Sequence, residues 1–194
     1  MLWGGVVGGA LELRRLDGGG VRLSGRFPYN TPAELAPGRF EMIAPRAFAG
    51  SITRGANIYL LAGHDFDRPL ASQAAGTLDL RDSDDALTFE ATIRDGTSWA
   101  RDFLAAHEAG LVRGLSPGFR VPADGERIDH SDGTLRRTIF AADLVELSGV
   151  TRPAYDSAQV EARCWDADKA ALNRTVEMCN RAYETPRNVY NRWR

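Results

Sequence analysis

Short runs of alternating apolar and polar residues recur along this chain and constrain its fold more than any other feature. The clearest are the runs 76–81 and 86–93, separated by the polar residues 82–85. Successive side chains of a strand point to opposite faces, so each run predicts a half-buried strand, and the pair predicts a β-hairpin. Further strands are expected at residues 11–16, 21–27, 40–43, 57–62, 111–121 and 136–150.

Two helices interrupt these strands. Apolar residues recur at helical spacing after Thr97, which predicts a helix capped by Asp95 or Thr97 and stopped by Gly110. A shorter helix is expected over residues 45–53, because proline is tolerated in a first turn. Together these patterns predict an α+β, mostly β fold, an antiparallel β-barrel or sheet with flanking helices. Turns or loops are expected at 28–38, 67–69 and 123–133.

The 194 residues fit one domain with short additions at either end. We expect a flexible Gly-rich leader over residues 1–20, a main domain over 21–157 and a C-terminal helical appendage over 158–194. The leader is apolar without a preceding basic region, which favours a cytoplasmic product over a secreted one. No run approaches the length of a membrane span.

The amino-acid composition argues against some classes of function. A net charge of −2 argues against a dedicated nucleic-acid binder. Cys164 and Cys179 lack the spacing of a zinc or redox motif, so no metal or cofactor is predicted.

Two sites far apart in the sequence suggest nucleophilic chemistry. Ser116 lies between Gly114 and Gly118, and His64 closes an apolar run. A serine becomes a nucleophile when a base lies beside it, and histidine is the usual base. The G-x-S-x-G pattern of an α/β-hydrolase requires a helix after the serine, whereas Phe119 and its neighbours continue an extended segment. A serine in a Gly-flanked bulge and a purely structural histidine remain the alternatives.

Glu146 is the candidate third member. It interrupts an otherwise apolar strand face, where a carboxylate needs a hydrogen-bond or ionic partner. Holding an imidazole tautomer is one solution, and a salt bridge to an arginine is the other. Asp143 is the alternative acidic residue. His107 and His130 are expected to be solvated rather than catalytic.

The order of short motifs resembles the prohead proteases of HK97-like tailed phages and of phage-derived gene transfer agents. The resemblance covers roughly residues 21–157. It is carried by Phe40-Glu-Met-Ile-Ala-Pro-Arg-Ala-Phe48, Gly63-His-Asp65, Pro69-Leu-Ala-Ser72, Gly76-Thr-Leu-Asp-Leu80, Leu87-Thr-Phe-Glu-Ala91, Val112-Arg-Gly-Leu-Ser-Pro-Gly-Phe119, Asp143-Leu-Val-Glu-Leu-Ser148 and Val150-Thr-Arg-Pro-Ala-Tyr155.

The resemblance implies a serine endopeptidase with a β-barrel ringed by helices, similar to herpesvirus assemblin. By position, His64, Ser116 and Glu146 would be catalytic. Such enzymes act inside the immature capsid in the host cytoplasm, cut the scaffold or the major capsid protein, often cut themselves and can form homo-oligomers. Pro117 departs from the family pattern and lacks an N–H, so an oxyanion hole would use Gly118 or a donor in residues 149–152.

Two rival interpretations stay open. The same fold could serve as a non-catalytic capsid-assembly or scaffold module. Alternatively, an unrelated barrel could bind a small ligand, with His64 and Glu146 as polar groups of its pocket.

Overall fold

A computed structural model describes residues 2–3, 10–16, 20–131 and 133–151 of the chain. These residues form a mostly β structure with two helices, which confirms the predicted class. The predicted appendage at 158–194 and the helix expected within it lie outside the described residues. Strands β1 and β2 lie within residues 1–20, and β2 corresponds to the short strand expected at 11–16.

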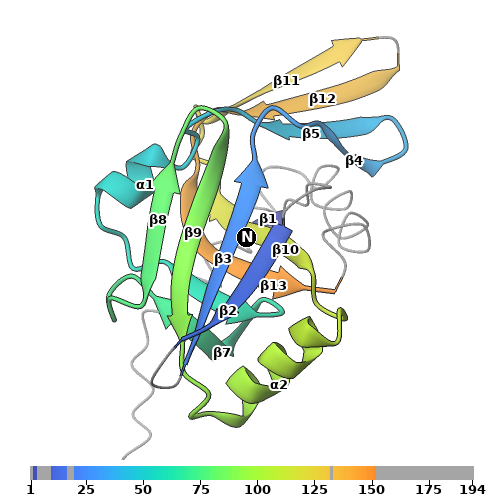
Figure 1. Cartoon of the computed structure of the whole chain (residues 1–194). Helices are drawn as coiled ribbons and strands as arrows, with labels where there is room; N and C mark the ends of the chain where they lie inside the picture. Colours follow the sequence, from blue (N-terminus) through green and yellow to red (C-terminus); the bar gives the residue numbers. More distant parts are fainter. Residues whose placement is uncertain (1, 4–9, 17–19, 132, 152–194) are drawn as a thin grey trace, which may run out of the picture.

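A mixed five-stranded sheet positions the residues of interest (Figure 1). Its order is β1-β10-β13-β6-β7. Strand β10 runs antiparallel to β1 and β13, β13 is parallel to β6, and β6 and β7 form a hairpin. The bounds are β1 Leu2–Trp3, β10 Gly114–Arg120, β13 Asp143–Val150, β6 Tyr59–Ala62 and β7 Asp65–Ser72.

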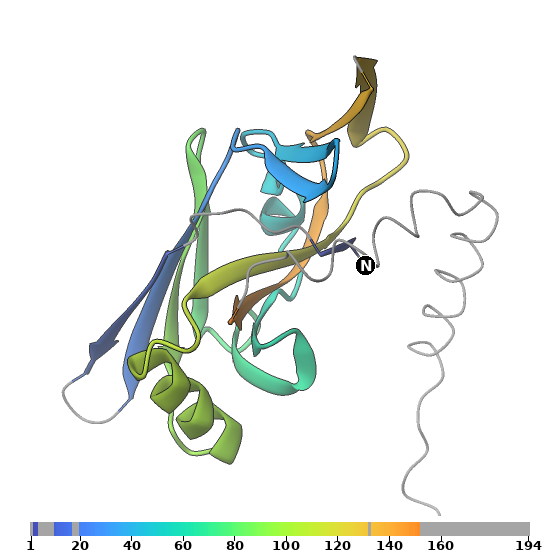
Figure 2. The ribbon, with the colours of Figure 1, turned by 90° about the vertical axis from the view of Figure 1, so that its right-hand side faces the viewer.

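Two four-stranded sheets complete the described structure. The antiparallel sheet β2-β3-β9-β8 comprises Ala10–Arg15, Val21–Pro28, Ala86–Ile93 and Leu78–Asp82. The sheet β11-β12-β5-β4 comprises Glu126–Ser131, Thr134–Ile139, Arg39–Ile43 and Ala33–Ala36. This last sheet projects beyond the other two at the top of the molecule (Figures 1 and 2).

The apolar core joins the first two sheets. Leu23, Phe27 and Leu87 from one sheet and Phe119 and Leu147 from the other belong to one buried cluster. Each such side chain contributes roughly 1.5–3 kcal/mol when it leaves water. The alternation that predicted these strands therefore also supplied the apolar faces that pack together.

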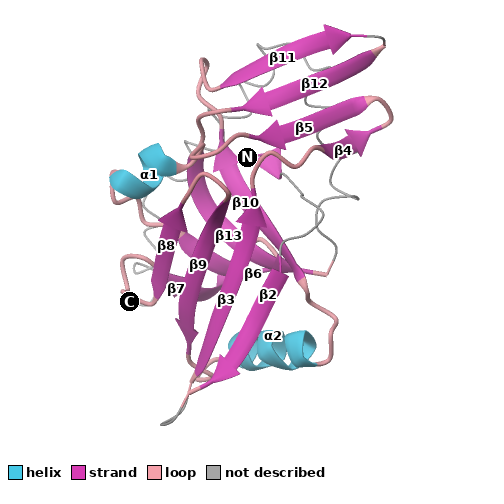
Figure 3. Ribbon diagram, turned by 45° about the horizontal axis from the view of Figure 1, so that its top comes forward, coloured by secondary structure: helices cyan, strands magenta, loops and turns pink. Residues whose placement is uncertain are grey.

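The two helices lie against the five-stranded sheet (Figure 3). Helix α2, Ser98–Glu108, begins at the Thr97 cap, where the threonine side chain accepts a hydrogen bond from Ala100 N. Phe103 of α2 packs onto the sheet at Gly149, where a Cβ atom would lie 2.5 Å from the ring. Helix α1 spans Ala49–Thr53, later than the predicted start at 45, because Arg46 has a positive φ of 57° that a helix cannot contain.

The described strands do not close into a barrel, so that part of the prediction is wrong. Closure would require the end strands of a sheet to pair, but β1 and β7 end the five-stranded sheet on opposite sides. The sheets are also not purely antiparallel, since β13 pairs with β6 and β12 with β5 in parallel.

Several boundaries differ from those expected. The long strand predicted at 136–150 is divided between β12 and β13, because residues 140–142 cross from one sheet to another, where Phe140 N donates to Gly125 O and Ala142 N to Ala47 O. The expected loops contain two strands, the four-residue β4 between Pro32 and Pro37 and the mostly polar β11. Residues 67–69 lie within β7, where Pro69 is tolerated because β7 is an edge strand.

Candidate active site

His64 lies in the two-residue turn that joins β6 to β7. Ala62 pairs with Asp65, and Gly63 and His64 both have positive φ, 66° and 63°, as a type I′ hairpin turn requires. Glycine adopts this conformation easily, whereas a histidine must be held in it. Ser148 helps to hold it, because its Oγ accepts a hydrogen bond from His64 N at 3.0 Å. Such backbone strain is often found at functional sites.

The side chain of Glu146 is fully buried and hydrogen-bonded through both oxygens. Its Oε1 lies 2.9 Å from His64 Nδ1, and its Oε2 accepts a hydrogen bond from Ser148 Oγ at 2.5 Å. An ionised carboxylate only accepts hydrogen bonds, so this contact suits the tautomer of His64 that carries its proton on Nδ1. In that tautomer the lone pair of the imidazole lies on the other ring nitrogen, Nε2.

Gly118 leaves room for the carboxylate of Glu146. Gly118 pairs with Glu146 across β10 and β13, and a Cβ atom at Gly118 would lie 2.0 Å from Glu146 Oε1. The second glycine of the Gly114-Leu-Ser-Pro-Gly118 motif therefore leaves the space that the glutamate occupies.

Ser116 lies on the adjacent strand, directly opposite Ser148. Residues directly opposite in an antiparallel pair share a face, with Cβ atoms about 4.5–5.5 Å apart. Ser116, Glu146 and Ser148 are thus neighbours on one face of the sheet, and Ser148 also contacts the turn that carries His64. The fold brings the three sequence-predicted residues to one region of the sheet, from β10, from β13 and from the turn between β6 and β7. Ser116 is only 1% exposed, and the His64 side chain is 21% exposed.

The alternative residues lie elsewhere or have other partners. Asp143 is 53% exposed and forms an ion pair with Arg54. His107 Nδ1 lies 2.6 Å from Val112 O at the end of α2, and His130 is exposed on β11. The arginine salt bridge considered for Glu146 is made instead by a different buried glutamate, Glu41.

The sequence did not reveal the contacts of Ser148, nor the space that Gly118 leaves for Glu146, although it offered the Gly118 N–H as an oxyanion donor. Ser148 lies two residues after Glu146, a spacing that places both on one strand face. That spacing is a usable signal, but serine at such a position is common. The clash at Gly118 depends on the register between β10 and β13, which the sequence does not display.

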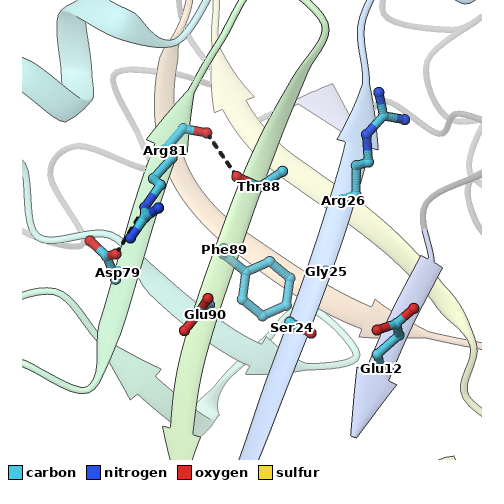
Figure 4. A pocket seen from close by; sticks show the side chains of 9 residues that line it. All are labelled: Glu12, Ser24, Gly25, Arg26, Asp79, Arg81, Thr88, Phe89 and Glu90. Carbon is cyan, nitrogen blue, oxygen red and sulfur yellow. Dashed lines mark hydrogen bonds and ion pairs between the residues drawn. The ribbon is translucent and has the colours of Figure 1, made fainter.

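Surface hollows occur away from these residues. One of about 320 Å³ lies on the outer face of the β2-β3-β9-β8 sheet, where charged side chains surround Ser24 and Gly25 (Figure 4). Another of about 420 Å³ lies near the turns beside Gly38 and Gly133. Within the described ranges, no group of three or more His, Cys, Asp or Glu side chains could hold a metal ion. No helix in this part of the chain is long and apolar enough to cross a membrane.

Comparison with known families gives the class of protein. Residues 10–172, well over half of the chain, match the family described as Caudovirus prohead serine protease. The chain belongs to this family, which confirms the resemblance to phage prohead proteases and indicates a capsid-maturation serine protease. No curated protein and no solved structure matches the chain. The likeness to assemblin and the link to gene transfer agents therefore stay predictions.

Proposed function

We propose that this protein is a serine endopeptidase that cleaves the scaffold or the major capsid protein, and its own chain, inside the procapsid of the host cell. The family supports a capsid-maturation protease that acts on capsid proteins. The arrangement around Glu146 supports a catalytic role for this chain in particular. It is the observation on which the proposal depends most: a fully buried carboxylate bound through one oxygen to His64 Nδ1, on the strand next to that of Ser116.

The proposed chemistry is acyl transfer. His64 Nε2 takes the proton of the Ser116 hydroxyl as its Oγ attacks the peptide carbonyl, and then donates that proton to the leaving amine. Water, deprotonated by His64 in turn, releases the acyl-enzyme and regenerates the serine. Glu146 holds the tautomer and offsets the charge of the imidazolium that forms.

A backbone donor must stabilise the tetrahedral oxyanion. Pro117 cannot serve, because proline has no N–H. The N–H of Gly118 and a donor in residues 149–152 are the two candidates. Loss of one such donor typically costs about 10²–10³ in kcat, so this choice matters for rate.

The decisive experiment is Ser116→Ala, co-expressed with the major capsid protein and its scaffold. Cleavage of the capsid protein, followed by gel electrophoresis and mass spectrometry of the new termini, is expected to stop. Ser131→Ala is the matched control, because Ser131 is an exposed serine on β11, outside the five-stranded sheet, and cleavage should continue. Processing at the normal rate in Ser116→Ala would leave the non-catalytic assembly module as the better interpretation.

A further inference from the structure

The nucleophile proposed above is buried in this structure. All residues of β10 from Gly114 to Phe119 are buried, and Ser116 is 1% exposed. A peptide carbonyl must come into contact with the serine oxygen before it can be attacked. The structure therefore shows the site closed, and a substrate must displace whatever covers this strand.

The two edges of β10 are covered differently. On its inner edge, β13 pairs with β10 along the whole strand, from Gly114 to Arg120. On its outer edge, the short strand β1 pairs antiparallel with β10, with Leu2 opposite Phe119 and Trp3 opposite Gly118. Figure 1 shows β1 lying beside β10 near the centre of the molecule. The register of β1 ends at Gly118, two residues from Ser116.

An extended peptide that reaches Ser116 needs this outer edge. Extended peptides bind proteins by adding a strand to a sheet edge, where main-chain hydrogen bonds supply much of the affinity. The inner edge belongs to β13, which carries Glu146 and cannot leave without dismantling the site.

We propose that the outer edge of β10 is the docking surface for an extended peptide, and that Leu2–Trp3 occupy it in competition with that peptide. The pairing of β1 shows that the edge accepts a main chain in the antiparallel direction. Two residues bind β10 weakly, because they form few main-chain hydrogen bonds. Since they belong to the same chain, their binding is intramolecular and their effective concentration is high. The peptide's role as a substrate rests on the proposed function, whereas the competition for the edge does not.

Proline substitution in β1 tests the competition. Leu2→Pro/Trp3→Pro removes both main-chain donors of β1, and only one of two successive residues faces β10, so the double change covers either case. Leu2→Ala/Trp3→Ala is the control, because it keeps both donors. All variants carry Ser116→Ala, so no cleavage of the probe interferes with the measurement.

The probe is a fluorescent peptide with the sequence of residues 1–7, Met-Leu-Trp-Gly-Gly-Val-Val. Its binding is measured by fluorescence anisotropy. We expect at least tenfold tighter binding to the proline variant than to the parent, with the alanine variant close to the parent. Equal affinity for the parent and the proline variant would overturn the proposal.

If the double variant does not fold, the same titration with Leu2→Pro and Trp3→Pro singly gives the answer, since one of them removes the donor that faces β10. The outcome of the peptide titration does not affect the co-expression experiment, in which loss of capsid-protein cleavage in Ser116→Ala tests catalysis alone. Failure of the edge proposal and failure of the protease proposal are therefore distinguishable.

Discussion

Glu41 and Glu146 are both buried glutamates on central strands, yet their partners differ in kind. Glu41 of β5 accepts a hydrogen bond from Arg137 Nη1 at 2.8 Å, and the same guanidinium donates through Nε to Glu126 at 2.6 Å. Glu146 of β13 instead contacts His64 and Ser148. An arginine keeps its proton throughout the physiological range, whereas an imidazole can gain and lose one.

This difference separates a structural carboxylate from one suited to catalysis. Arg137 and Glu41 are each about 4% exposed, so this ion pair is buried within the projecting sheet and shielded from water. The His64 ring is 21% exposed although its partner Glu146 is fully buried. A buried carboxylate that is hydrogen-bonded to a partly accessible imidazole, as Glu146 is, can support proton transfer. A carboxylate paired with a buried guanidinium, as Glu41 is, cannot.

Glu146→Gln is the substitution with the largest expected effect. The amide keeps the volume but loses the negative charge and can donate to Nδ1, which favours the wrong tautomer of His64. Such a change lowers kcat by about 10⁴-fold in a serine protease triad. Single-turnover cleavage of the capsid protein measures it, with Glu41→Gln as the matched variant that should retain activity. Equal losses in the two variants would erase the distinction between the glutamates.

Arg137→Met is expected to affect stability and not chemistry. It leaves the buried Glu41 without its cation, which costs about 3–5 kcal/mol of unfolding free energy. Urea denaturation followed by circular dichroism measures the loss, and the cleavage rate of the folded fraction should match that of the parent. A large fall in that rate would mean that the projecting sheet takes part in the reaction.

Gly118→Ala tests the space that the Glu146 carboxylate occupies. The added methyl group must push Glu146 Oε1 away from His64, and a displacement of about 1 Å at a catalytic group can cost 10²-fold in rate. Gly96→Ala is the control, because nothing lies within 4 Å of a Cβ atom there and its φ is not positive. A Gly118→Ala variant as active as the control would show that the Glu146–His64 contact does not limit the rate.

Ser148→Ala tests the hydroxyl that joins Glu146 to the His64 turn. Its loss leaves the buried Glu146 Oε2 without this donor and His64 N without this acceptor, at a cost of about 1–3 kcal/mol for an unsatisfied group. We expect kcat to fall by roughly tenfold at little change in KM, and Ser148→Thr, which keeps the hydroxyl, to restore it. A changed melting temperature without a change in kcat or its pH profile would assign Ser148 a structural role only.

The pH dependence of stability should show the smallest effect. Burial raises the pKa of Glu41 above its ordinary value of 4.5, although Arg137 partly opposes the shift. The folded state then binds the proton more tightly than the unfolded state, so the stabilisation is complete below 4.5 and is lost as pH rises through the raised pKa. Urea titrations over this range should show the parent losing stability relative to Glu41→Gln. Parallel curves would contradict the shift.

Much of this fold could be predicted from local patterns. The hairpin β8–β9, the strand that holds Ser116 and the Thr97-capped helix follow from periodicity and capping alone. Strand β11 was missed because its pairing with β12, rather than an apolar face, defines it. Strand β4 was missed because its four residues lie between Pro32 and Pro37, which indicate a loop. The division of 136–150 was missed because the apolar run Ile139-Phe-Ala-Ala142 joins the two halves, and apolarity does not reveal a change of sheet.

The sequence by itself determined which residue types are present and how they are spaced: a serine between glycines, a histidine at the end of an apolar run, and a lone carboxylate on an apolar strand. It also determined the family. Tertiary structure alone decided that Glu146 meets His64 rather than an arginine, because that choice depends on the parallel pairing of β13 with β6. Such pairing joins residues more than eighty positions apart, and a slip of one residue would turn Glu146 to the opposite face.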